Sequence, residues 1–435
     1  MRARLHKRLL GTVLQGAVLL GCASPTLAQD NVDIPLDLQA IPEGTGDDTN
    51  WSDVTDTRPV RFEFGLGLRR ETMGGPLDSL VDDAGTLSFA SLAVDIDTQL
   101  GAGFDFLGRG VAHFEEGKTD LLLQRAVLSF APQDSRLRAS LGKEYFAHSF
   151  TELAHVLDLS PREAARIDTD DTREDYAYPF ARLGFDVGAH HLSLIAMSQG
   201  HDLTHAEDDP WLYALRYETQ RGEANLSAHV IHRDDADTEF GFGINAPVGA
   251  AILSFEGTVS DRRRLPLTDL RPGGGELRAT GADTPTYQTV LAARIPVSSK
   301  WQAEAAYLYN GHGYSDAEWR DFRSAEDAVL AGMRVGNFRY ADFLGDAQAA
   351  HADQYLRRNY VTFALSSLEE IGQWSATAGA VGGLDDGSAF GFAEASRPIG
   401  TAGRFSVSMS GGSGSRDSEF VRRSSEVEMK LVWGF

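Results

Sequence analysis

Runs of alternating apolar and polar residues are the feature that most constrains the fold of this chain. Between Val60 and Phe435, apolar side chains recur at every second position in runs of about ten residues, the length that a tilted strand needs to cross a bilayer. The last run, Ser424 to Phe435, ends on an aromatic residue, and Trp433 lies two positions earlier. The pattern predicts an all-β chain whose strands each have one apolar and one polar face.

The connections between these runs alternate between short and long. Short turns are expected at 98–101, 132–135, 188–190, 220–223, 247–250, 296–299, 366–373 and 397–403, and longer loops at 71–85, 115–120, 151–177, 200–210, 233–238, 261–284, 311–353, 383–387 and 411–419. A β-sandwich has no reason to alternate its connections in this way, whereas a membrane barrel has short periplasmic turns and long extracellular loops. We therefore predict a single transmembrane antiparallel up-and-down β-barrel of about eighteen strands. Sixteen strands are the alternative, because the runs at 87–96 and 100–113 are irregular.

The start of the chain has the pattern of an export signal. Four basic residues precede an apolar run from Leu9 to Leu20, and small residues around Ala28 offer a cleavage site. A lipoprotein signal, in which Cys22 becomes the lipidated N-terminus, is the competing interpretation. The predicted organisation is a signal peptide over 1–28, a flexible periplasmic segment over 29–59 and the barrel over 60–435.

Composition and motifs exclude several classes of function. The formal net charge of −23 argues against non-specific binding of nucleic acid. Motifs typical of hydrolases, metalloproteases and nucleotide-binding loops are missing, so we predict no enzymatic activity and no cofactor. Two acidic groups, at 168–175 and 201–209, could bind a divalent cation, but solvated loops are the preferred interpretation and no metal site is predicted.

The polar positions of the predicted strands define a charged lumen. If the apolar set, including Phe390 and Phe392, faces lipid, the complementary set must face inward. The lumen or constriction candidates are Arg61, Arg69, Arg125, Arg138, Arg182, Arg216, Arg294, Arg404, Glu428 and Lys430, accompanied by Glu63, Glu144, Asp186, Glu218, Glu256 and Glu304. An arginine-rich constriction that selects anionic solutes is one hypothesis. Pairing of these arginines with acidic residues on neighbouring strands is an equally weighted alternative.

Two long loops are candidates for a constriction or plug. Residues 151–176 contain a helix start in which Ser160 caps and Pro161 takes the first position. The loop from Gly311 to Asp353 contains a predicted short helix from Ser324 to Met333, with Ser324 as its cap. A loop of such length is usually functional or folded inward, while an extracellular cover that contacts only lipopolysaccharide is the alternative.

The closing run resembles the last strand of Gram-negative outer-membrane β-barrels, and that resemblance implies that Trp433 and Phe435 form a signal for the barrel assembly machinery. A second, shorter resemblance lies within residues 137–161. There Gly142, Lys143 and Glu144, followed by Asp158 and Pro161, are similar to a strand and loop of alginate-export-like porins. That resemblance implies an eighteen-stranded barrel with arginines in its lumen.

The expected function is that of an outer-membrane porin for small hydrophilic solutes, with anions as the candidate class. One alternative is a loop-plugged exporter or uptake barrel for an anionic polysaccharide or organic acid. A second alternative is a surface enzyme or adhesin on a barrel scaffold. The expected partners are outer-membrane lipid, lipopolysaccharide, the barrel assembly machinery and small polar solutes. The identity of the solute and the oligomeric state do not follow from the residues.

Overall fold

The computed structural model describes residues 59–72, 84–115, 118–132, 135–146, 148–151, 153–159, 177–198, 210–234, 237–263, 265, 267–271, 274–278, 285–338, 343–345, 347, 351, 355–368 and 373–435. All of them belong to one compact unit, residues 44–435. The side chains of 84–85, 267–271 and 274–278 are outside this description. No helix in the described ranges is long and apolar enough to cross a membrane.

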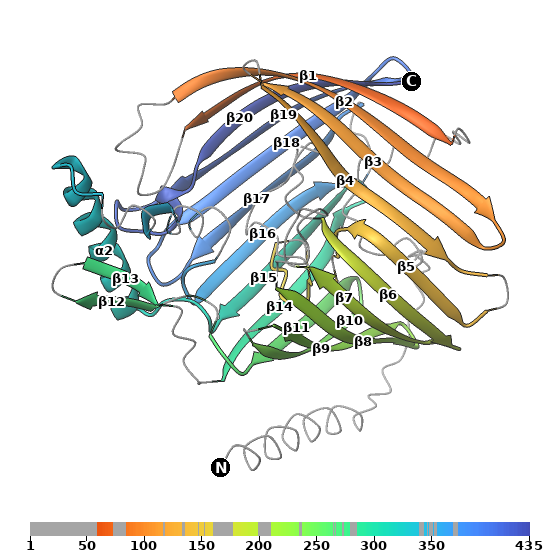
Figure 1. The fold of residues 1–435 in the computed structure, drawn as a ribbon, viewed down its shortest axis with the longest axis horizontal. Coiled ribbons are helices and arrows are strands. Elements are labelled where there is room, and N and C mark those ends of the chain that lie inside the picture. Colours follow the sequence, from red (N-terminus) through yellow and green to blue (C-terminus); the bar gives the residue numbers. More distant parts are fainter. Residues whose placement is uncertain are drawn as a thin grey trace, which may run out of the picture. The chain divides into compact units, whose positions relative to one another are not determined.

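Eighteen strands form one closed antiparallel sheet (Figure 1), and a separate hairpin adds two more among the described residues. The barrel strands are β1 (Val60–Thr72), β2 (Ala84–Gly101), β3 (Phe104–Glu115), β4 (Lys118–Phe130), β5 (Leu137–Glu144), β6 (Tyr178–Val187), β7 (His190–Ser198), β8 (Trp211–Arg221), β9 (Ala224–Arg233), β10 (Thr238–Val248), β11 (Ala251–Ser260), β14 (Thr286–Ser298), β15 (Trp301–Asn310), β16 (Asn359–Ser367), β17 (Ser375–Gly383), β18 (Ala389–Ile399), β19 (Gly403–Ser413) and β20 (Ser425–Gly434). The hairpin consists of β12 (Leu267–Arg271) and β13 (Gly274–Arg278). The predicted count of eighteen is confirmed, because both irregular runs form full strands, β2 and β3.

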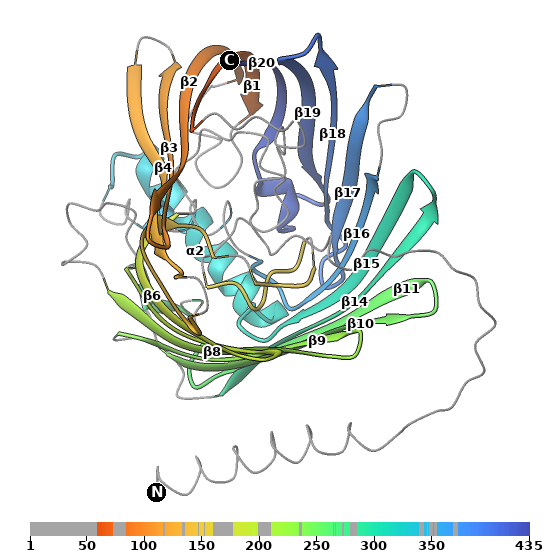
Figure 2. The same ribbon diagram turned by 90° about the vertical axis from the view of Figure 1, so that its right-hand side faces the viewer.

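The barrel closes where the first strand meets the last. Strand β1 pairs with β2 along one edge and with β20 along the other, so the strands form the complete ring that Figure 2 shows. Beyond the ladder, the main chains of Phe62 and Phe435 exchange two hydrogen bonds, of 3.0 and 2.9 Å. Their rings also stack, with centroids 6.2 Å apart. Phe435 is therefore a structural part of the seam.

Side-chain alternation separates an outer apolar surface from a polar inner wall. On β1, even-numbered apolar residues such as Phe62 and Leu66 are exposed, whereas the odd-numbered Gly65 and Arg69 are buried. The same two-residue period holds on β8 and β10. Apolar side chains that face lipid remain solvated by hydrocarbon, so their exposure carries no penalty in a membrane.

One prediction about these faces is wrong. Phe390 and Phe392 on β18 point into the barrel and are buried, instead of facing lipid. They pack with Phe420 from the connection that follows β19, in a cluster that also includes inward residues of β14–β17. An aromatic residue satisfies the period-2 pattern on either face, and the inner face here is covered by a folded loop.

The connections differ in length between the two ends of the strands. At one end β6 and β7 are separated only by residues 188–189, β8 and β9 by 222–223, and β10 and β11 by 249–250. At the other end lie 145–177, 261–285, 311–358 and 414–424. We call these the short-turn end and the long-loop end. The β12–β13 hairpin lies within 261–285, where no strand was predicted.

Candidate solute path through the barrel

The predicted lumen residues lie on the inner wall, and most of the arginines are paired. Ion pairs join Arg69 to Glu115 (2.8 Å), Arg125 to Glu144, Arg138 to Asp186 (2.7 Å), Arg216 to Glu218 (2.9 Å) and Arg294 to Glu304 (2.8 Å). Arg182 donates to Ser140 (3.2 Å), and Arg404 donates to Ser396 (2.7 Å). Arg61 shares the inner parity of β1, and Glu428 and Lys430 are buried on β20. Cross-strand pairing with acidic residues thus describes Arg69, Arg125, Arg138 and Arg294, whereas Arg216 pairs with Glu218 on its own strand.

Arg109 on β3 is an inner-wall residue that sequence reasoning missed. Its guanidinium bridges Glu63 on β1 (2.8 Å) and Asp95 on β2 (3.0 Å), and its Nε donates to Gln124 (2.9 Å). The irregular run that contains Arg109 hid its parity, because a register shift lies beside it in the pairing of β3 with β4. The sequence did contain one signal for Arg109. Glycines flank it on both sides, so it is the only residue with a side chain in 108–110.

A glycine near the end of β5 lies very close to the backbone of β4. Gly142 has a φ of +145°, and a Cβ there would lie 1.8 Å from the carbonyl oxygen of Ala126. Only glycine permits this backbone and this approach. The described residues that follow, 145–159 except 147 and 152, form what we call the inner loop, which Figure 2 shows inside the ring of strands.

Asp158 organises the inner loop from within. Its carboxylate accepts hydrogen bonds from the Tyr145 hydroxyl (3.0 Å), the Ser149 amide (2.7 Å) and the His148 amide. Ser149 in turn accepts from the amide of Leu157 at 2.9 Å. A buried carboxylate that accepts several amide hydrogen bonds fixes the local backbone. The predicted helix start at Ser160 lies outside the described residues.

The inner loop reaches from one wall of the barrel to another. Phe146 and Leu159, at its two ends, pack in an apolar cluster with inward residues of β4 and β6–β9. Leu153 and Ala154, at its middle, pack in a different cluster with inward residues of β14–β18. The Tyr355 hydroxyl also donates to the carbonyl of Leu153 (2.7 Å). The loop therefore crosses the lumen and is held at both sides by apolar packing.

The loop also covers the wall formed by β8–β11. Burial, and secondarily the charge of Arg216 on β8, lower the pKa of His148 well below its usual value. The amide of Phe150 donates to Glu256 on β11. On β10, a Cβ at Gly243 would lie 2.7 Å from Leu157 and 2.8 Å from Phe150. These strands therefore contact the loop directly.

On the wall formed by β1–β3, a cluster of charged side chains keeps partial exposure. The side chains of Arg109, Glu63 and Asp95 are 14%, 21% and 20% exposed, respectively, whereas Arg216 beneath the loop is 4% exposed. Charged groups that stay hydrated can line a water-filled path, whereas groups packed in a dry core cannot. The sector of the lumen along β1–β3 is therefore the candidate path for solute.

A helix lies across the long-loop end. Helix α2 (Asp316–Arg334) extends beyond the strand ends in Figure 1 and falls within the ring of strands in the end view of Figure 2. Its N-cap is Ser315, which forms a reciprocal capping box with Glu318. The predicted helix start at Ser324 is wrong: that hydroxyl lies within the helix and donates to the carbonyl of Arg320 (2.7 Å). The S-x-x-E spacing at Ser315 was present in the sequence.

The cap, defined as α2 with the described residues of 311–358, has its own apolar core. Trp319, Phe322 and Leu330 of α2 pack with Leu265, Tyr314 and Leu356, and with Phe343, Leu344 and Ala347. The amide of Tyr314 donates to the carbonyl of Leu356 at 2.7 Å, which brings the two ends of this segment together. The cap is thus a packed unit at the mouth of the barrel.

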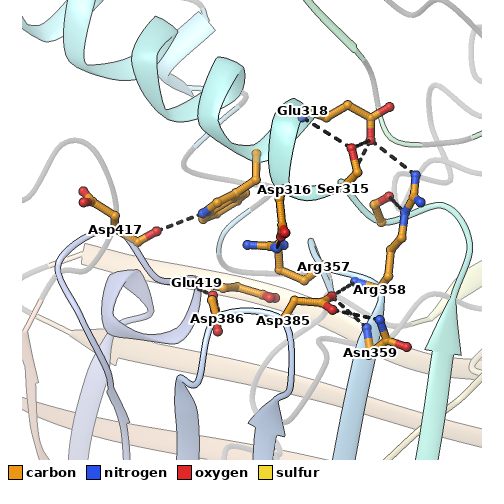
Figure 3. Close-up of polar contacts among 12 residues, drawn as sticks. Ser315, Asp316, Glu318, Arg357, Arg358, Asn359, Asp385, Asp386, Asp417 and Glu419 are labelled. Carbon is orange, nitrogen blue, oxygen red and sulfur yellow. Dashed lines mark hydrogen bonds and ion pairs between the residues drawn. The ribbon is translucent and has the colours of Figure 1, made fainter.

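Polar contacts tie the cap to neighbouring loops (Figure 3). Arg357 pairs with Asp316, and Trp319 donates to the carbonyl of Asp417 (2.8 Å). Asp385 accepts from the amides of Arg358 and Asn359, at 2.8 and 3.0 Å.

The charge of one cap carboxylate is protected against acid. Burial alone would raise the pKa of Glu318, but hydrogen bonds from Arg263 (2.5 Å) and Ser315 lower it to about 2. These ties therefore persist in mild acid.

A buried charged cluster in the cap responds differently to acid. Glu326 accepts from His351 (2.8 Å) and pairs with Arg323, while Arg422 lies 3.6 Å away. Burial alone would raise the pKa of Glu326, but His351 and the two arginines lower it. Burial lowers the pKa of His351, even though Glu326 opposes that shift. The imidazole is therefore neutral at neutral pH.

The substitution His351→Gln is expected to make the cap less sensitive to acid. The folded pKa of His351 lies below the unfolded value of about 6.5, so the unfolded state binds more protons between these two values. Cap stability should fall as pH drops below about 6.5 in the wild type, and less so in the variant. Hydrogen exchange of α2 amides between about pH 7.5 and pH 5, corrected for intrinsic rates, measures this difference.

Cap stability must be compared between the wild type and His351→Gln at each pH, because the titration of Glu419 changes stability in the opposite direction from that of His351. Burial raises its pKa to about 7, although hydrogen bonds from Tyr360 and Leu356 oppose the shift. Its contribution to stability is therefore present at low pH and lost as pH rises through about 7. Identical pH profiles for the wild type and His351→Gln would contradict a neutral buried His351.

Metal sites are not part of the described structure. Within the described ranges, no group of three or more His, Cys, Asp or Glu side chains could hold a metal ion. Both candidate groups from the sequence, 168–175 and 201–209, lie outside those ranges.

Comparisons with known proteins support the fold. No protein-family model matches the sequence, and no curated protein sequence matches it. The chain is similar in structure to Pseudomonas aeruginosa OccK11 (OpdR), with a TM-score of 0.50 and 10% identity over 86% of this chain and 95% of that one. Pseudomonas aeruginosa OccK5 (OpdH) gives a TM-score of 0.49 and 8% identity over 86% and 97%, and a mutant of Rh. blastica porin gives 0.42 and 12% over 86% and 99%. At 10% identity the likeness to OccK11 shows the fold alone. The resemblance to alginate-export-like porins stays a prediction.

Proposed function

We propose that this protein is an outer-membrane channel for small hydrophilic solutes. The observation that carries the proposal is the inner loop, whose described residues cross the lumen between the β4–β9 and β14–β18 walls, while Arg109 and Glu63 on the β1–β3 wall keep partial exposure. A closed barrel of this strand number is wide enough to hold a water channel. The outward apolar belt and the signal-like N-terminus support a location in the outer membrane of a Gram-negative bacterium.

The lining favours a weakly selective channel. Arg109 lies between two carboxylates, and Arg69 faces Glu115, so positive charge on this wall is largely compensated. An anion preference would therefore depend on small imbalances of charge rather than on a ring of unpaired arginines. We infer that neutral polar solutes and small anions pass in preference to large or apolar molecules.

Neutralising Arg109 should shift selectivity toward cations. Arg109→Ala leaves Glu63 and Asp95 without their shared guanidinium, so the path gains net negative charge. The measurement is the reversal potential of single channels in planar bilayers under a salt gradient. Arg70→Ala is the matched control, because Arg70 is exposed and has the outward parity of the same strand. Wild-type protein that is folded yet never conducts would overturn the proposed function.

A loop-plugged exporter or uptake barrel for an anionic polysaccharide or organic acid is a second candidate. The cap favours it, because a packed unit tied to several loops lies across the long-loop end. In that case the channel would conduct poorly until the cap moves. The proposed orientation places the long-loop end outside the cell and the short turns in the periplasm.

A further inference from the structure

We propose that Glu256 is a positioning residue that holds the inner loop across the lumen. The inference rests on the proposed channel function, and it assigns control of the opening to one carboxylate in the barrel wall. Glu256 lies on the inner face of β11, and its side chain is 0% exposed. Its Oε1 accepts a hydrogen bond from the amide of Phe150, which is 106 positions away in the chain.

The wall provides a notch next to this carboxylate. Gly243 on β10 lies directly opposite Glu256 in the strand register. Phe150 and Leu157 of the inner loop occupy the space where a Cβ at Gly243 would lie. The same segment of the inner loop therefore contacts both strands. It packs over Gly243 on β10 and donates a hydrogen bond to Glu256 on β11.

The β11 strand itself does not need a buried glutamate at position 256. The neighbouring inward residues of β11, Ser254 and Thr258, are small and polar, and the ladder bonds of β11 to β10 and β14 do not involve side chains. A buried carboxylate is costly unless donors compensate it. Here the loop amide donates to the Glu256 carboxyl group, so the loop and this side chain stabilise each other. Loss of the acceptor should release the loop from β11 while the barrel remains closed.

Thiol labelling of the loop tests this directly. Ala154 is 0% exposed and packs on the β14–β18 wall, so Ala154→Cys is a reporter of loop release. The single native cysteine, Cys22, is replaced by serine to leave one thiol in the full-length chain. The reaction of the folded, detergent-solubilised protein with a small charged maleimide is followed over time. Glu256→Ala should speed labelling about tenfold or more, as expected from the loss of one buried hydrogen bond.

Two matched variants make the result specific. Glu256→Gln keeps a carbonyl acceptor and should label about as slowly as the parent. Glu304→Ala removes the same side chain from another inner-wall position, where Glu304 forms an ion pair with Arg294, so it should also label slowly. Equal labelling rates in Glu256→Ala and the parent would overturn the proposal. If Glu256→Ala fails to fold, Gly243→Ala should accelerate labelling instead, and slow labelling there would overturn it.

Channel recordings separate this inference from the proposed function. In a conducting protein, Glu256→Ala should raise the conductance and the open-channel noise, and Glu256→Gln should not. If no variant conducts but the labelling pattern is as expected, the positioning role stands and the proposed function fails. If the channels conduct but labelling does not respond to Glu256, the positioning role fails alone.

Discussion

Replacing residues 315–353 with a short glycine–serine linker is expected to raise the single-channel conductance severalfold. The linker removes α2, which lies across the long-loop end of the barrel. Tyr314 and Leu356 are joined by a hydrogen bond of 2.7 Å, so a few residues can connect the two ends without strain on β15 or β16. The contact between Leu356 and Glu419 (2.9 Å) is retained. Planar bilayer recordings at fixed salt measure the change.

The control for this deletion keeps the cap but alters its surface. Asp321→Ala changes an exposed residue of α2 and leaves the buried face intact, so its conductance should match that of the wild type. An unchanged conductance after the linker replacement, in protein that is folded by gel migration, would show that the cap does not obstruct the path. A large increase together with a new flux of anionic oligosaccharide would instead favour the plugged transporter.

Deleting Phe435 is expected to reduce strongly the yield of folded barrel. The residue contributes two main-chain hydrogen bonds to Phe62 and a ring stack at the closing seam. An unclosed barrel exposes the edges of β1 and β20, whose unpaired amides and carbonyls are costly in a bilayer. The fraction of protein that migrates as a compact species on gels without boiling, and shifts after boiling, measures folding.

A conservative change distinguishes the ring from the chain length. Phe435→Tyr keeps both the main-chain contacts and an aromatic ring, so it should fold nearly as well as the wild type. Phe435→Ser keeps only the main-chain contacts and should give an intermediate yield if the ring also serves as an assembly signal. A normal yield after deletion of Phe435 would contradict both roles.

The paired lumen changes how the arginine content of this sequence is interpreted. An arginine on the inner parity was consistent with either a charged constriction or a cross-strand ion pair. Arg294 and Glu304 illustrate the second outcome, since they face each other in the register of β14 and β15. Pairing in a narrow lumen lowers the cost of each charge and leaves polar groups for solute.

The amino-acid sequence determined where the barrel strands lie and where the chain reverses between them, because both follow from local patterns. A two-residue period decides which side chains share a face, and turn composition decides where the chain reverses. Only the tertiary structure decided which inner residues are dry. Phe390 obeys the same period as a lipid-facing residue, but contacts with Phe420, far along the chain, bury it inside. Likewise, Glu256 meets Phe150 across 106 positions of the chain, a long-range contact that no local pattern encodes.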